Sequence, residues 1–150
     1  MRILVGTIAG AIIVSLLSAW AVGALLTERV AIIGSFLGLQ RSYNEGVAFG
    51  IFLGSYQDII ILVAIGVLTY AAWRSAHTTL EQIGFGLILG GGIANVIDRV
   101  PDGLVTDMIQ VGSFPIFNVA DASINIGVFL LVLSFFQQRK NSRCQIPGSN

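Results

Sequence analysis

The chain has 150 residues, of which 55% are hydrophobic and only 11% are charged, and its formal net charge at pH 7 is zero. The mean hydropathy of +0.85 lies well outside the range of soluble domains, and a neutral chain offers no basic surface for nucleic acid. The single cysteine, Cys144, excludes an internal disulfide framework, and the single histidine, His77, argues against a histidine zinc site. We therefore expect a membrane protein that binds no nucleic acid, no metal and no cofactor.

Four long apolar runs predict four transmembrane helices, at about residues 3–26, 57–74, 82–99 and 116–136. A helix that crosses the hydrocarbon core needs about 20 apolar residues, and the second and third runs reach this length only with their flanking residues. The expected fold class is an all-α membrane protein with one integral domain, 1–150, that ends in a cytoplasmic tail at 137–150. A cleaved signal peptide is the alternative for the first run, because small residues surround Trp20.

The segment between the first two apolar runs, at about 27–56, is too polar and too rich in glycine to cross a membrane. Its pieces 30–33 and 36–39 are short and have the composition of strands. They predict a small extracytoplasmic sheet, a β-cradle, between the first and second helices. An irregular loop is the alternative.

The third apolar run contains many glycines, among them Gly84, Gly86 and the consecutive glycines at 90–92. Small residues at helical spacing allow neighbouring helices to approach closely in a membrane. A phosphate-binding loop is disfavoured, because no lysine follows and no strand precedes the glycines. We therefore expect these glycines to be packing surface.

The distribution of Lys and Arg predicts the orientation. With four spans, the side that holds both termini collects most of the positive charges: Arg2, Arg74, Arg139, Lys140 and Arg143. The other side holds Arg29, Arg41 and Arg99. Positive charge marks the cytoplasmic side, so both termini are expected inside.

Two aspartates, Asp107 and Asp121, lie near apolar runs where an ionised group is costly, by estimates from about 3 to above 10 kcal/mol. A pair of carboxylates at the end of a helix bundle can activate a water molecule against an amide bond. This predicts an intramembrane aspartyl protease.

Four further polar residues accompany the aspartates. Asp98 and Arg99 are adjacent, and adjacent positions on a helix do not face each other, so each is expected to pair with another part of the bundle. Asn95 lies one turn before them, and Asn118 lies three residues before Asp121. Amides beside carboxylates commonly hold them in position. Each of the four could equally be a buried structural hydrogen-bonding group.

Taken together, the polar residues and glycines form an ordered set of motifs: Asn44-x-Gly46-x-Ala48-Phe49, Gly91-x-x-x-Asn95-x-x-Asp98-Arg99, Gly103-x-x-x-Asp107 and Phe117-Asn118-x-Ala120-Asp121. In order, spacing and hydropathy this set resembles lipoprotein signal peptidase, also called signal peptidase II, over roughly residues 15–133.

The resemblance implies a four-helix protein of the bacterial inner membrane with an extracytoplasmic β-cradle. It implies that Asp107 and Asp121 are the catalytic dyad near the extracytoplasmic face and that the other motif residues bind substrate or support the site. The implied reaction removes the signal peptide from diacylglyceryl-modified prolipoproteins, just before the lipidated cysteine. Membrane lipid and these precursors are the expected partners, and the protein is expected to act as a monomer.

The first helix departs from the family pattern. The family usually carries Asp-x-x-x-Lys there, whereas the aligned positions here are Ser15 and Ala19. Loss of both charges together is what loss of an internal ion pair would look like, and it leaves the dyad untouched. Two other functions stay open: a non-catalytic protein of the same fold that binds lipidated peptides, and a small proton-coupled transporter, although the chain has no internal repeat.

Overall fold

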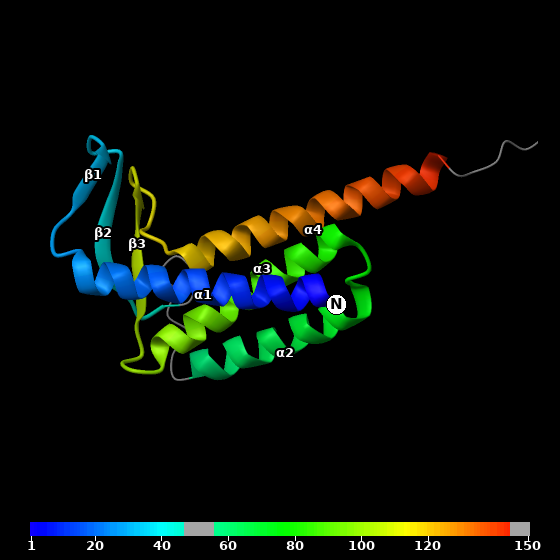
Figure 1. The fold of residues 1–150 in the computed structure, drawn as a ribbon, viewed down its shortest axis with the longest axis horizontal. Helices are drawn as coiled ribbons and strands as arrows, with labels where there is room; N and C mark the ends of the chain where they lie inside the picture. Colours follow the sequence, from blue (N-terminus) through cyan, green and yellow to red (C-terminus); the bar gives the residue numbers. More distant parts are fainter. Residues whose placement is uncertain (47–55, 145–150) are drawn as a thin grey trace, which may run out of the picture.

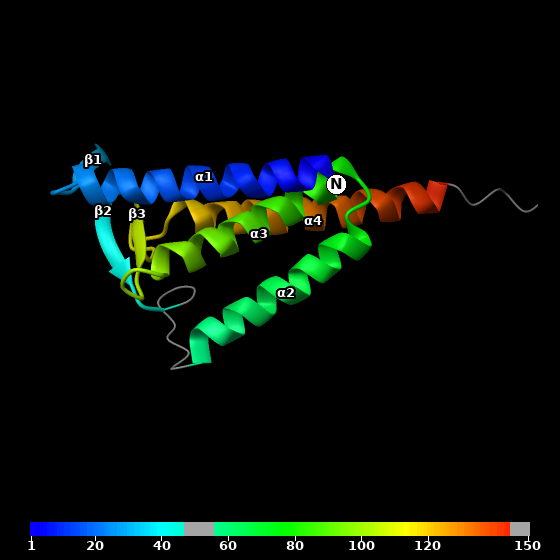
Figure 2. The ribbon, with the colours of Figure 1, turned by 60° about the horizontal axis from the view of Figure 1, so that its bottom comes forward.

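Helix α3 (Thr79–Arg99) lies at the centre of the protein and packs closely against α1 (Arg2–Leu25) and α4 (Val119–Cys144). Helix α2 (Gln57–Ser75) contacts α3 over a smaller area (Figure 1, Figure 2). This computed structural model describes residues 1–46 and 56–144. The predicted site residues Ala48 and Phe49 lie outside the described residues. A three-stranded sheet crosses one end of the bundle, beside the end of α1 and the start of α4 (Figure 1).

The N-terminus of α3 is set by its sequence. The Thr78 hydroxyl accepts a hydrogen bond from the Glu81 backbone N–H at 3.2 Å, and the Glu81 carboxylate accepts one from the Thr78 N–H at 2.8 Å. This capping box satisfies two N–H groups that the first turn of a helix leaves unpaired. The helix therefore begins at Thr79, a few residues before the predicted span.

The outer surface of the bundle is apolar and its interior holds small and polar residues. Trp20, Val63 and Phe129 are exposed, whereas the buried face of α1 includes Ala11 and Ser15. Among the described residues, three helical stretches are long and apolar enough to cross a membrane, Arg2–Leu25, Thr79–Arg99 and Val119–Lys140, and α2 has a shorter apolar segment, Ile59–Ser75. Soluble proteins have the reverse arrangement, with apolar residues inside, so the distribution seen here identifies a helical membrane protein.

The sheet is antiparallel, in the order β1 (Val30–Ile33), β2 (Leu37–Asn44) and β3 (Val105–Val111). The predicted strand at 30–33 is confirmed, and the predicted strand at 36–39 begins one residue later, at Leu37, and continues as the longer β2. The prediction that the whole sheet lies between the first two helices is wrong, because β3 comes from the connection between α3 and α4. Strand β3 depends on pairing with β2, which lies more than 60 residues earlier in the sequence. Its polar residues Thr106 and Asp107 interrupt the apolar pattern by which a strand is recognised in a sequence.

Close approach of the helices depends on the glycines of α3. A methyl group at Gly90 would lie 2.6 Å from the Ala11 side chain in α1, and one at Gly91 would lie 2.5 Å from the Ala120 carbonyl oxygen in α4. Side-chain carbons do not approach other atoms so closely, so α3 can hold both neighbours only where it lacks side chains. The predicted packing role is confirmed for Gly84, Gly86, Gly90 and Gly91, whereas Gly92 has room for a side chain. At Gly91 the packing also sets the position of the first turn of α4.

We predict that Gly91→Ala destabilises the protein and that Gly92→Ala does not. The new methyl at position 91 meets backbone that cannot rotate away, which typically costs about 1–3 kcal/mol. At Gly92 the nearest atoms belong to the flexible Ile65 side chain, 3.7 Å away, and alanine is the better helix former. Thermal unfolding in detergent measures both. Equal melting temperatures for the two variants would contradict the close contact between α3 and α4.

Candidate active site

Asp107 lies on the central part of β3, opposite Ser42 of β2, and only 2% of its surface is exposed. One carboxylate oxygen accepts a hydrogen bond from the Asn44 side-chain amide at 3.1 Å. The other accepts one from the Asn118 side-chain amide at 2.9 Å. The carboxyl group is therefore held from two sides by neutral donors, one from β2 and one from the start of α4.

The orientation of both amides is set by the backbone. The Asn44 side-chain oxygen accepts from the Gly46 N–H at 2.8 Å, and the Asn118 side-chain oxygen accepts from the Asp121 N–H at 2.8 Å. Each amide must then turn its NH₂ group toward Asp107. Short-range turn and cap geometry thus fixes which atoms the buried carboxyl group meets.

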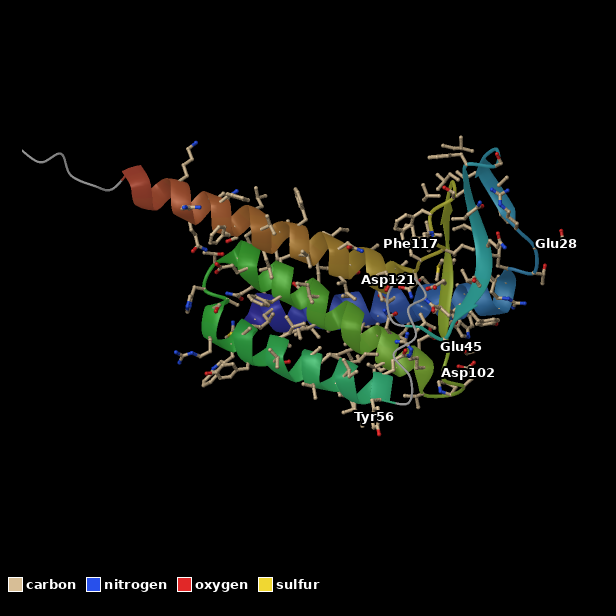
Figure 3. All side chains as sticks on the ribbon, turned by 180° about the vertical axis from the view of Figure 1, so that it is seen from behind. Glu28, Glu45, Tyr56, Asp102, Phe117 and Asp121 are labelled. Carbon is tan, nitrogen blue, oxygen red and sulfur yellow. The ribbon has the colours of Figure 1, made fainter. Side chains whose placement is uncertain are left out.

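Asp121 lies in the first turn of α4, where it shares a capping arrangement with Asn118. Asn118 precedes the helix and caps the Asp121 N–H, while the Asn118 N–H lies 3.5 Å from the Asp121 carboxylate. Figure 3 shows Asp121 at the start of α4, close to the sheet. The three-residue spacing of Asn118 and Asp121 in the sequence is therefore the spacing of a helix cap.

Asn95 of α3 connects the two carboxyl groups. Its NH₂ group donates to Asp121 at 3.0 Å, and its side-chain oxygen accepts from Asn118 at 3.1 Å. Because Asn118 also donates to Asp107, a continuous path of hydrogen bonds runs from Asp107 through Asn118 and Asn95 to Asp121. We call Asn95 and Asn118 the amide bridge.

Burial raises the pKa of Asp107 to about 6, from an ordinary value of 3.8. The hydrogen bond from Asn44 opposes this rise, the negative charge of Asp121 adds to it, and Asn118 and Arg99 oppose it in turn. The carboxyl group therefore exchanges its proton close to neutral pH, as a general acid or base must.

Asp98 and Arg99 bind different segments, as their adjacency predicted. The Asp98 carboxylate accepts from the Thr106 N–H at 2.7 Å, which holds β3 immediately before Asp107. The buried Arg99 guanidinium donates to the Gly46 carbonyl, which holds the end of β2 and its turn. The end of α3 thus fastens both strands that carry the polar site.

Gly103 and Ala120 complete the predicted set. Gly103 has a φ of +81°, in the left-handed region that favours glycine, and its N–H donates to the Arg99 carbonyl at 2.7 Å. It allows the chain to turn sharply from α3 into β3. Ala120 is 3% exposed, and its carbonyl faces Gly91. The structure brings together Asn44, Asn95, Asn118 and both aspartates. The other three residues shape the backbone: Gly91 and Ala120 allow α3 and α4 to pack closely, and Gly103 allows the turn into β3.

A cleft of about 420 Å³ opens beside Asp121, and most of its lining was missed by the sequence analysis. Its walls are mainly apolar, from the loop before α4 and the first two turns of that helix: Phe114, Pro115, Ile116, Phe117, Ala122, Ile124 and Ile126, with Asn44 and Asn125 as polar members. Figure 3 shows Phe117 beside the start of α4. The unusual aromatic and proline run at 114–117, directly before a helix cap, is the signal that could have indicated this cleft.

Comparison with known proteins places the whole arrangement in one family. A family model described as signal peptidase (SPase) II, of the peptidase A8 group, matches residues 7–137. The chain belongs to the signal peptidase II family. This confirms the predicted family and, with it, the predicted class of enzyme, a membrane peptidase of the aspartic type.

Relatives in the signal peptidase II family cover most of the chain. A protein of Shouchella clausii named lipoprotein signal peptidase is 39% identical over 122 residues, which are 79% of this chain and 81% of that protein. One of the same name from Dehalococcoides mccartyi is 40% identical over 127 residues, 79% of each. A solved bacterial membrane enzyme, determined by the in meso method at 2.3 Å resolution, has a TM-score of 0.86, 26% identity, and coverage of 100% and 96%.

We predict that ionisation of Asp107 destabilises the folded protein. Since its pKa is higher in the folded chain than in the unfolded one, the folded state binds the proton more strongly between about pH 4 and pH 6. This contribution to stability is fully present below about pH 4 and is lost as the pH rises through 6. The melting temperature of the wild type should fall over this interval, relative to that of Asp107→Asn.

Melting curves of both proteins in the same detergent, from pH 4 to pH 7.5, measure this difference. The introduced amide turns a donor toward Asn44 or Asn118, a cost that does not change with pH, so only the difference in slope is informative. Parallel curves would contradict the raised pKa.

Proposed function

We propose that this protein removes signal peptides from diacylglyceryl-modified prolipoproteins, just before the lipidated cysteine, with Asp107 and Asp121 as the catalytic dyad. The observation that carries the proposal is the pair of carboxyl groups joined by the amide bridge beside an apolar cleft. The names of the relatives support the substrate class. All the groups that the reaction requires come from a single chain, which favours a monomer.

The proposed mechanism uses one proton shared by the dyad. Two nearby carboxyl groups in surroundings of low dielectric do not both ionise readily, so one keeps its proton. Asp107 is assigned this role, because it is the buried member with the raised pKa. Asp121, which lines the cleft, takes a proton from a water molecule as that water attacks the scissile carbonyl carbon.

Completion of the reaction follows from the same assignment. Asp107 donates its proton to the developing oxyanion, which gives a neutral gem-diol, and Asp107 takes a proton back from this gem-diol as the C–N bond breaks. The leaving amine, on the lipidated cysteine, receives the proton that Asp121 took from the water. The products are a carboxylic acid on the signal peptide, which then ionises in water, and a free amine on the mature lipoprotein, and both aspartates are back in their starting protonation states.

The cleft supports a substrate with an apolar chain. Aromatic and branched side chains such as Phe117 and Ile124 line it next to Asp121, and the exposed outer faces of the helices are apolar as well. A signal peptide or a diacylglyceryl group can enter from the membrane without crossing a charged surface. Membrane lipid is therefore proposed to surround the cleft.

We further propose four spans, with α2 as the shortest, both termini in the cytoplasm and the dyad toward the extracytoplasmic face. The N-terminus and the start of α3 lie at one end of the bundle, where the Met1 ammonium donates to Gln82 at 2.9 Å. The sheet, whose strand β3 carries Asp107, and the start of α4, which carries Asp121, lie at the opposite end (Figure 2). The positive charges near the termini support the cytoplasmic assignment of the first end.

We predict that Asp107→Asn and Asp121→Asn each reduce cleavage of a diacylglyceryl prolipoprotein by a factor of about 10² to 10⁴ or more, because an amide cannot exchange the proton. Asp102→Asn is the matched control: Asp102 is exposed and accepts a hydrogen bond from the Leu104 N–H at 2.9 Å, which an amide oxygen can also accept. Mass spectrometry of the released signal peptide, with purified protein in detergent, measures turnover.

Near wild-type activity in either dyad variant would overturn the assignment of the dyad. Intact substrate that binds but is never cleaved by the wild type would instead favour a non-catalytic protein that binds lipidated peptides. The control variant should cleave at the wild-type rate in the same preparation.

A further inference from the structure

The contact between α1 and α3 is tight at one end and opens at the other. At Gly90 the two helices are so close that an added methyl would lie 2.6 Å from the Ala11 side chain. One turn further along α1, at Ser15, a small cavity of about 10 Å³ begins. Ser15 and Ala19 form its α1 wall, and Ala94, Asn95 and Asp98 form its α3 wall. The cavity lies on the side of the amide bridge that faces the first helix.

The hydroxyl group of Ser15 differs from three other hydroxyl groups on the helices. Those of Thr7, Ser18 and Ser123 each donate to a backbone carbonyl three or four residues earlier, at 2.7–2.9 Å. Ser15 is 5% exposed, and within residues 1–46 and 56–144 its hydroxyl oxygen has no hydrogen-bond partner. A buried hydroxyl without a partner is costly, so its orientation into the cavity needs a physical reason.

The size and the lining of the cavity match one water molecule. A volume of roughly 10–15 Å³, measured with a water-sized probe, is the minimum for one water, which also needs two to four polar partners. Besides Ser15, the polar lining residues are Asn95, Asp98, Thr106 and Asn118. One oxygen of Asp98 is bound by the Thr106 N–H, and a carboxylate has capacity for further donors.

We propose that this cavity binds one ordered water molecule, which accepts a hydrogen bond from the Ser15 hydroxyl and donates one to the Asp98 carboxylate. The water joins α1 to the residue that holds the Thr106 N–H, and so to the strand position directly before Asp107. It satisfies the Ser15 hydroxyl without a direct contact between the two helices. Ser15 is thereby a positioning residue that acts through the water.

The sign of a stability change tests the water site. If the water is bound, Ser15→Ala removes one of its partners, and the melting temperature in detergent should fall by about 2–4 °C. If the cavity is dry, Ser15→Ala removes an unsatisfied hydroxyl, and the melting temperature should stay the same or rise, which would overturn the proposal. Ser18→Ala is the control, since its hydroxyl donates to the Ser15 carbonyl and does not line the cavity.

A crystal structure of the wild type grown in a lipid mesophase, at about 2 Å resolution, gives an independent readout. The proposal requires a density peak about 2.7–3.1 Å from the Ser15 hydroxyl oxygen and from an Asp98 oxygen. An empty cavity at that resolution would overturn it.

The positioning role rests on the proposed peptidase function and is tested separately. Ser15→Ala should lower kcat several-fold with little change in KM, because no residue that lines the cavity also lines the apolar cleft, whereas Ser18→Ala should change neither. An unchanged kcat together with an observed water would overturn the positioning role and leave the water site. If the wild type itself cleaves no prolipoprotein, the proposed function fails, while the melting and crystallographic results still decide on the water.

Discussion

The structure depends on one electrostatic constraint: two carboxyl groups must be held near each other at the end of an apolar bundle. A buried cation bound directly to each would lock both in the ionised form. The chain instead uses neutral amides, Asn44 and the amide bridge of Asn95 and Asn118, which donate to the carboxyl groups without adding charge. The pKa of Asp107 can therefore rise to about 6 as burial dictates, although Arg99 at some remove lowers it slightly.

Most other features of the fold place these amides. The cap of α4 orients Asn118, and the turn after β2 orients Asn44. The small residues of α3 allow α1 and α4 to approach, so that Asn95 reaches the first turn of α4. Buried polar groups and a carboxyl group with a raised pKa reduce the stability of the fold. Functional sites usually carry such a cost, and the packing of the surrounding residues offsets it.

The sequence was sufficient for the membrane class, for the family, and for naming the polar residues that the structure brings together around Asp107 and Asp121. These signals are local in composition or appear as ordered spacings, as in the cap that joins Asn118 to Asp121. It was not sufficient for β3, because a strand that contains Thr106 and Asp107 is stable only when β2 supplies its hydrogen bonds from far away in the sequence. The cleft was also missed, since no residue type by itself indicates that Phe117 and Ile124 line the same space.

We propose that Asn95 and Asn118 act as one unit that holds the two aspartates, and a double-mutant cycle on kcat tests this coupling most directly. Asn95→Ala, Asn118→Ala and the double variant would be compared with the wild type on one diacylglyceryl prolipoprotein. The bridge predicts that either single change causes most of the loss and that the second adds little, a coupling of about 0.5–3 kcal/mol. Additive losses, with coupling near zero, would contradict the account.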